Sequence, residues 1–242
     1  EFPVVAPEDA EGMFDVLTYE KGASVVRMLE QYLGADRFRD GIRHYMRTHR
    51  YGNTETTDLW DAIEETTGEP VRSTMDSWIF QGGYPLVGVE LSERGDGLVL
   101  TQRRFRFRPT EEDATVRWQV PVRLRAGVND AVVERRVLLD GAAATVPLGG
   151  KPAWAVVNAG GSGFYRTRYS PELLRALTAQ VASLPAIERV NLVGDTWAAV
   201  LAGYADVGDF VDLAALFSGE TDPTVWQMVL ALLGMFELVL PD

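Results

Sequence analysis

The stretch MFDVLTYEKGASVVRMLEQYL, residues 13–33, decides how the first part of this chain folds. Its apolar side chains recur at spacings of three and four residues, which places them on one face of a helix. The residues of this face are Phe14, Val16, Val25, Val26, Met28, Leu29 and Leu33. Gly34 then supplies a favourable C-terminal stop. Tyr19 stands out because it is a polar aromatic residue in the middle of a predicted core-facing helix.

Three more helices are predicted before residue 82. The second begins at Asp36, and its apolar face consists of Phe38, Ile42, Tyr45 and Met46. Thr57 is the expected N-cap of the third helix, which Gly68 ends. The fourth begins with Pro70 in its first turn and stops at Gly82-Gly83. Four short helices of this kind predict one compact unit.

At Tyr84-Pro85 the apolar period changes from about 3.6 residues to 2, which indicates strands. Asp96-Gly97 is a strong hairpin-turn signal between two alternating runs. The predicted strands cover residues 86–91, 98–107, 117–125, 131–139, 143–148, 153–157 and 164–169. Their spacing is typical of a small β-sandwich.

After Ser170-Pro171-Glu172, a good cap and first turn, the helical period returns. It continues through residues 173–184, 187–202, 210–217 and 224–240, short helices that predict the beginning of an α-solenoid-like domain. The fold class is therefore α+β and multidomain. The predicted domains are residues 1–84, residues 85–169 and residues 170–242.

The composition excludes several classes of function. The net charge of -12 argues against a nucleic-acid role, because phosphate binding rests on an excess of Lys and Arg. The absence of cysteine excludes a disulfide scaffold and thiolate metal sites, and it is consistent with a reducing compartment such as the cytoplasm. The sequence contains neither a signal-peptide pattern at its start nor an apolar run of 18 residues that would predict a membrane span.

Both ends of the sequence look cut. The chain opens at Glu1 without a methionine, and it closes immediately after an apolar helix. Apolar residues surround most of this last helix, and such helices are normally buried on several sides. We therefore expect the chain to self-associate through it.

Two further motifs are typical of nucleic-acid or phosphate binding, but the residues around each favour a structural role. Nine arginines lie between Arg103 and Arg136, but they alternate with apolar residues as in a sandwich strand with one solvated face. The glycine-rich run at 158–163 lacks the Lys-Ser/Thr of a phosphate-binding loop and precedes a strand. We interpret the first as a polar sheet face and the second as a turn.

Tyr19-Glu20-Lys21-Gly22-Ala23-Ser24, followed by Met28-Leu29, resembles the segment that carries the catalytic tyrosine in zinc metallo-aminopeptidases of the aminopeptidase N type. Seven further motifs follow in the order that this family has. They are Tyr51-Gly52-Asn53, Asp58-Leu59-Trp60, Gly68 with Pro70-Val71, Met75 to Trp78, Gly83-Tyr84-Pro85, Gly163 to Arg166 and Glu188 to Asp195. Together they extend over nearly the whole chain.

The resemblance implies a role for two residues. Tyr19 corresponds to the tyrosine that donates its O–H to the oxyanion formed when zinc-activated water attacks the peptide carbonyl. Phe14 stands where the family has an aromatic residue lining the pocket for the substrate's N-terminal side chain. Judged without the motif, Tyr19 reads as a core tyrosine and Phe14 as a packing residue.

The zinc site of the family is missing from this sequence. That site needs H-E-x-x-H, in which two histidines share a helix face, and a further glutamate downstream. The only histidines here, His44 and His49, are five residues apart, a spacing that turns them away from a common face. The G-A-M-E-N segment that grips the substrate amine is also absent. We therefore expect zinc in the intact enzyme and none in this chain.

The resemblance implies a segment of a zinc aminopeptidase that acts on peptides. It would contain the helical tail of a thermolysin-like catalytic domain, the β-sandwich and the first helices of the terminal domain. The alternative is a non-catalytic binding or scaffold module of sandwich plus solenoid, in which Tyr19 is a core residue.

Overall fold

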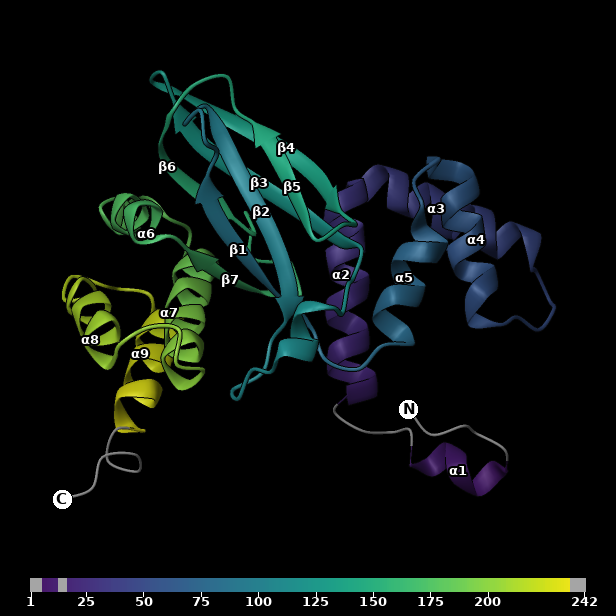
Figure 1. Ribbon diagram of the computed structural model, residues 1–242. Helices are drawn as coiled ribbons and strands as arrows, with labels where there is room; N and C mark the ends of the chain where they lie inside the picture. The colour runs from purple at the N-terminus through teal and green to yellow at the C-terminus, as the bar shows by residue number, and fades with distance from the viewer. Residues whose placement is uncertain (1–5, 13–16, 236–242) are drawn as a thin grey trace.

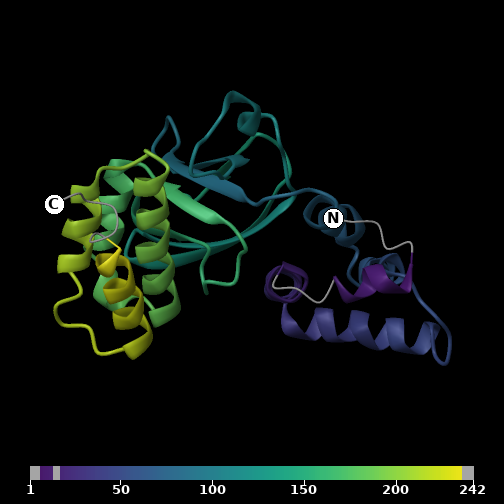
Figure 2. The ribbon, with the colours of Figure 1, turned by 90° about the horizontal axis from the view of Figure 1, so that it is seen from below.

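The computed structural model describes residues 6–12 and 17–235 of the chain. Two small sheets form its middle, the first helices lie on one side of them, and the last helices lie on the other (Figure 1). The view from below shows the two helical groups separated by the sheets (Figure 2). None of the helices in this described part is long and apolar enough to cross a membrane.

The first group of helices follows the predicted pattern, with differences in several details. Its elements are α1 (Pro7–Glu11), the π-helical turn η1 (Leu17–Lys21), α2 (Gly22–Leu33), α3 (Ala35–Thr48), α4 (Thr56–Thr67) and α5 (Val71–Ile79). Gly68 ends α4 in the left-handed conformation, as predicted. The cap of α4 is Glu55 instead of Thr57, because Glu55 and Asp58 form a reciprocal capping box. Met46, expected on the apolar face of α3, is 62% exposed, and α5 ends at Ile79, before the predicted Gly82-Gly83.

The strands form two sheets that pack face to face. The first contains β1 (Pro85–Leu91), β2 (Gly97–Arg104), β5 (Ala143–Pro147) and β7 (Arg166–Tyr169), in the order β5-β2-β1-β7. The second contains β3 (Val120–Val128), β4 (Ala131–Leu139) and β6 (Pro152–Val157), in the order β4-β3-β6. Pairing is antiparallel except between β1 and β7. A short 3-10 turn, η2 (Glu111–Ala114), precedes β3.

The last helices pack as a second apolar group against the sheets. They are α6 (Pro171–Thr178), the 3-10 turn η3 (Val181–Ser183), α7 (Ala186–Leu201), α8 (Val207–Ala215) and α9 (Pro223–Gly234). α9 buries Val225 and Val229, while Leu230 is 59% exposed. The predicted residues 236–240 of this helix lie outside the described part of the chain, and its self-association stays a prediction.

A buried tryptophan joins the first helices to the sandwich. Trp78 of α5 has no exposed surface, and its indole N–H donates to the carbonyl of Gln119 at 2.9 Å. Its ring lies 6.1 Å from that of Trp118 and 6.3 Å from that of Phe164. One continuous apolar cluster therefore runs from the first helices into the sandwich.

Two ion pairs join the sheets to α7. Arg166 Nη1 of β7 lies 3.1 Å from Asp195 Oδ1, and Asp195 Oδ2 accepts hydrogen bonds from the backbone and hydroxyl of Thr167. Burial raises the pKa of the Asp195 carboxyl, while Arg166 and Thr167 oppose that rise. Arg125 of β3 lies 2.5 Å from Glu188, whose side chain is 1% exposed.

A buried glutamine connects the two sheets. Gln102 of β2 accepts a hydrogen bond from the backbone N–H of Trp118 at 2.9 Å and donates to the Trp118 carbonyl. It also donates to the carbonyls of Leu139 and Gly141, at the end of β4. Trp118 and Leu139 are buried and Gly141 is half-buried, so this one amide pairs backbone groups that have little access to water.

We predict that Gln102→Leu lowers the free energy of unfolding by about 3 kcal/mol, because it keeps the side-chain size but leaves buried backbone groups unpaired. Urea denaturation with the slope checked for constancy measures the change. Thr101→Val, one residue away on the exposed side of β2, is the control and should shift stability by less than about 0.5 kcal/mol. A loss below about 1 kcal/mol for Gln102→Leu would show that the amide does not hold the sheets together.

Candidate functional site: an exposed tyrosine on a π-helical turn

Tyr19 lies on the π-helical turn η1, directly before α2. The predicted single helix over residues 13–33 is therefore interrupted in its hydrogen-bonding pattern between Leu17 and Lys21. π-helical turns are rare, and they occur frequently at functional sites. Phe14 and Val16 lie outside the described residues, so the structure does not place the predicted pocket residue.

The side chain of Tyr19 is 58% exposed. The core interpretation of this residue is therefore wrong for this structure, since a core tyrosine buries its ring. Two other tyrosines show the contrast: burial raises the pKa of Tyr165 well above its ordinary value and also raises that of Tyr169. Tyr19 instead lies largely at the surface of the described part of the chain.

The turn is fastened to the rest of the molecule at its C-terminal end. Lys21 Nζ donates to the backbone carbonyl of Gln81 at 3.4 Å. The side-chain amide of Gln81 donates in turn to the carbonyl of Arg117, at 2.9 Å, on the approach to the sandwich. Lys21 and Gln81 were not identified from the sequence, because a link between residues this far apart leaves no periodic signal.

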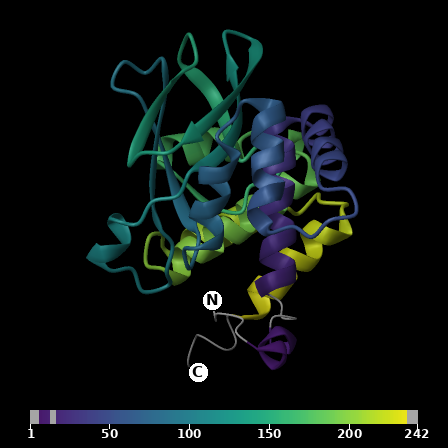
Figure 3. The ribbon, with the colours of Figure 1, turned by 90° about the vertical axis from the view of Figure 1, so that its right-hand side faces the viewer.

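The helix that follows the turn, α2, packs its apolar face against the rest of the molecule. α2 buries Val25, Met28, Leu29 and Leu33. The backbone N–H of Phe164 points to the sulfur of Met28 at 3.4 Å. α2 packs against α3 and β3, and Figure 3 shows it among the first helices. The Tyr19 turn thus leads into a helix with a buried face, and helices position functional side chains more precisely than loops do.

The two histidines lie apart, as their spacing predicts. His44 Nε2 on α3 is 2.8 Å from Glu65 of α4, and the His49 ring, at the end of α3, is 5.2 Å from that of Tyr45. Within residues 6–12 and 17–235 no three His, Cys, Asp or Glu side chains are grouped so that they could hold a metal ion. A catalytic zinc takes about three protein ligands and a water, so the described residues do not fit this metal.

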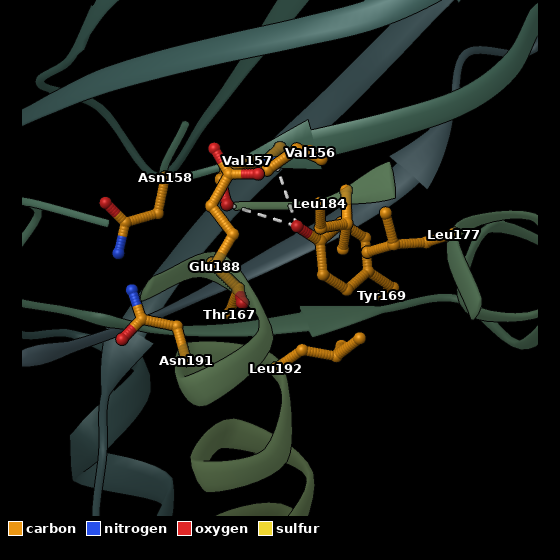
Figure 4. A pocket seen from close by; sticks show the side chains of 10 residues that line it. All are labelled: Val156, Val157, Asn158, Thr167, Tyr169, Leu177, Leu184, Glu188, Asn191 and Leu192. Carbon is orange, nitrogen blue, oxygen red and sulfur yellow. Dashed lines mark hydrogen bonds between the residues drawn. The ribbon is translucent and has the colours of Figure 1, made fainter. Parts of the chain in front are cut away.

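A small cavity lies between β6, β7 and the helices α6 and α7 (Figure 4). Its volume of about 20 Å³ suits a single water molecule and no substrate. Its polar side chains already have structural partners. The Tyr169 hydroxyl accepts from the Val157 N–H and donates to the Val157 carbonyl, and Glu188 accepts from the Gly160 N–H. This cavity serves packing.

Two family models match separate parts of the chain. Residues 1–78 match the peptidase family M1 domain, and residues 154–242 match the ERAP1-like C-terminal domain. The first range contains Tyr19 and the first helices. The second begins within β6 and contains the last helices.

Curated relatives align with almost the whole chain. The puromycin-sensitive aminopeptidase of Caenorhabditis elegans is 34% identical over 229 residues, which is 92% of this chain and 24% of the relative. The tricorn protease-interacting factor F2 of Thermoplasma acidophilum is 32% identical over 244 residues, 100% of this chain and 29% of the relative. Aminopeptidase 2 of Candida albicans is 32% identical over 243 residues, 99% of this chain and 26% of the relative.

These matches place the chain among the peptidases. Its exposed Tyr19 lies directly before α2. The chain belongs to the M1 family of peptidases, in agreement with the resemblance to aminopeptidase N. It spans between 24% and 29% of the length of the three relatives described above.

We predict that the 242-residue chain alone retains no stoichiometric zinc, since two separated histidines cannot start such a site. Elemental analysis after exhaustive dialysis measures the metal content, and a fluorogenic aminoacyl-amide assay with added zinc measures turnover. One tightly held zinc per chain, or zinc-dependent turnover above the blank, would reveal a metal site that these residues do not suggest.

Proposed function

We propose that this chain is part of a zinc-dependent aminopeptidase that releases N-terminal residues from peptides, and that Tyr19 stabilises the oxyanion. The proposal is supported by family membership, by relatives named aminopeptidases, and above all by the exposure of Tyr19 on a π-helical turn. Zinc would have to be held by residues other than those described here.

The contribution of Tyr19 follows from the chemistry of a peptide carbonyl. When a nucleophile attacks the carbonyl carbon, negative charge develops on the oxygen. A donor fixed beside that position gains more from the charged transition state than from the neutral substrate, so it lowers the barrier. Lys21 and Gln81 keep the turn in place through the hydrogen bond between them, which limits the reorganisation needed during the reaction.

The same proposal assigns roles to the three predicted domains. Residues 1–84 form the end of a thermolysin-like catalytic domain, residues 85–169 form a β-sandwich, and residues 170–242 begin an α-solenoid-like domain. The two matched family ranges support the first and the last of these roles.

The alternative is a non-catalytic sandwich-plus-solenoid module for binding or scaffolding. In that case Tyr19 is expected to pack in the core, whereas its side chain is 58% exposed. The exposure therefore favours the enzyme.

We expect Tyr19→Phe in the intact protein to lower kcat by about 10² to 10³ with little change in KM, because one oxyanion donor is lost. Steady-state kinetics on an aminoacyl amide measures both constants. Tyr51→Phe is a matched control, since Tyr51 is 93% exposed and lies in the loop after α3. A kcat for Tyr19→Phe within about threefold of the unmodified enzyme would refute the assignment.

We expect Phe14→Ala to change the preference among N-terminal side chains more than it slows all substrates, because a pocket wall discriminates by size and apolar contact. The ratio of kcat/KM for a large and a small aminoacyl substrate measures this. A uniform loss across substrates would assign Phe14 to packing instead.

A further inference from the structure

A groove of about 510 Å³ opens over the outer face of β3 and β4. Its floor includes Arg123, Glu134 and Arg136, and its walls are the end of α2, at Gln31 and Gly34, and the turn at Gly160. Volumes of about 300–1,000 Å³ are typical of small-molecule sites. The groove is separate from the Tyr19 turn, which lies at the opposite end of α2.

The strand register places several charges on this outer face. Val122, Leu124 and Ala126 of β3 are buried inside the sandwich, so Arg123 and Arg125 leave the strand on the other side. Arg123 lies opposite Arg136 of β4, and Arg125 lies opposite Glu134. Arg135, which follows Glu134 in β4, is exposed and also lines the groove, and its Nη1 donates to the Glu134 carbonyl at 2.9 Å.

Arg125 is the arginine of this face that has a carboxylate partner. Glu188 holds it at 2.5 Å and also accepts the Gly160 N–H at 2.8 Å. Arg123 Nη1 donates to the Gln31 amide oxygen at 3.2 Å, and Arg136 Nη1 donates to the Tyr32 carbonyl at 3.0 Å. Among the described residues, neither Arg123 nor Arg136 has a carboxylate oxygen within 4.0 Å.

Two like charges directly opposite each other on neighbouring strands destabilise a sheet. Arg123 and Arg136 are such a pair, and their present acceptors are neutral. Each guanidinium has five N–H donors in a planar fork, so each retains donors for another ligand. Gly160 lies beside Arg123, since a Cβ built on it would be in ordinary contact with Arg123 Nη1 at 3.6 Å.

We propose that this groove binds a compact oxyanion with two or more negative charges, held between the guanidinium groups of Arg123 and Arg136. Guanidinium forks pair with phosphate and carboxylate oxygens through two parallel hydrogen bonds. The ligand is small because the chain carries a net charge of -12, which repels an extended polyanion at long range. Glu134 faces the same groove and weakens binding.

Calorimetric titration of the intact protein with inorganic pyrophosphate, and separately with citrate, tests this site at about 0.15 M ionic strength without divalent metal. We expect one saturable site per chain. Arg123→Gln and Arg136→Gln should each weaken binding by about tenfold or more. The single variants Arg94→Gln and Arg108→Gln have the same charge change as each groove variant and should bind normally, since both residues are exposed and outside the groove.

Glu134→Gln gives the sharper test, because it should tighten binding by about twofold to fivefold. Arginines that serve only to anchor α2 would not produce a gain from this change. Arg136→Lys keeps the charge and loses the fork, so it should bind with intermediate affinity and guards against misfolding of the Gln variants. Binding of both anions indicates a site for charge, and binding of pyrophosphate alone indicates a phosphate site.

Three outcomes would overturn the proposal. The first is the absence of saturable binding of either anion below about 5 mM. The second is an equal loss in the groove variants and in the Arg94→Gln and Arg108→Gln controls. The third is unchanged or weaker binding by Glu134→Gln.

Discussion

The position of the Tyr19 helix depends on the burial of the Trp78 indole. A fully buried indole needs an acceptor for its N–H, and the carbonyl of Gln119, just before β3, is that acceptor. The bond brings α5 against the sandwich, where the Trp118 and Phe164 rings complete the contact. Phe164 also contacts Met28 of α2. The helix that begins at the Tyr19 turn is thus placed by a contact made near its middle.

The joint on the other side of the sandwich is built differently. α7 carries Glu188 and Asp195 to Arg125 and Arg166 of the two sheets, and both carboxylates are almost completely buried. Such pairs contribute little net stability, because desolvation offsets most of their attraction, but removal of one partner leaves a buried charge that costs about 3 to 5 kcal/mol. They therefore specify where α7 docks more than how tightly it docks. The apolar contacts around Trp78 stabilise the packing of the first helices on the sandwich, whereas the ion pairs fix the position of α7.

The sequence predicted the parts of the fold that burial makes periodic. Helices α2 to α5 and strands β1 to β7 follow from apolar spacings, and Gly68 takes the left-handed conformation that its position needs. The hairpin between β1 and β2 is present, but its turn glycine is Gly95, which has a positive φ, whereas Gly97 is already the first residue of β2. The cap of α4 was predicted at Thr57 because threonine is a strong cap residue, whereas the reciprocal pairing of Glu55 with Asp58 decides the observed cap. The observed cap therefore lies two residues before the predicted one.

Other features have no local signal in a single sequence. A π-helical turn differs from an α-helix by its hydrogen-bond spacing, so the exposure of Tyr19 could not be read from residues 13–33. Gln102 looks like one polar residue in an alternating strand, although it connects two sheets through residues up to 39 positions away. Tyr19 itself was found through a motif. The spacing of apolar residues alone predicted a core residue, because that spacing carries information about burial and none about catalytic chemistry.

The arginine-rich segment shows how far a correct local pattern can reach. Alternation of Arg with apolar residues predicted a strand with one polar face, and Arg123 and Arg125 do lie on such a face. The pattern could not show that Arg125 pairs with Glu188 of a distant helix, while Arg123 lies across from Arg136 on the neighbouring strand. A lone arginine on a wet sheet face needs no partner, since water solvates it. Arg123 and Arg136 lie opposite each other on neighbouring strands, where like charges are unfavourable, and the anion proposed for the groove would relieve that repulsion.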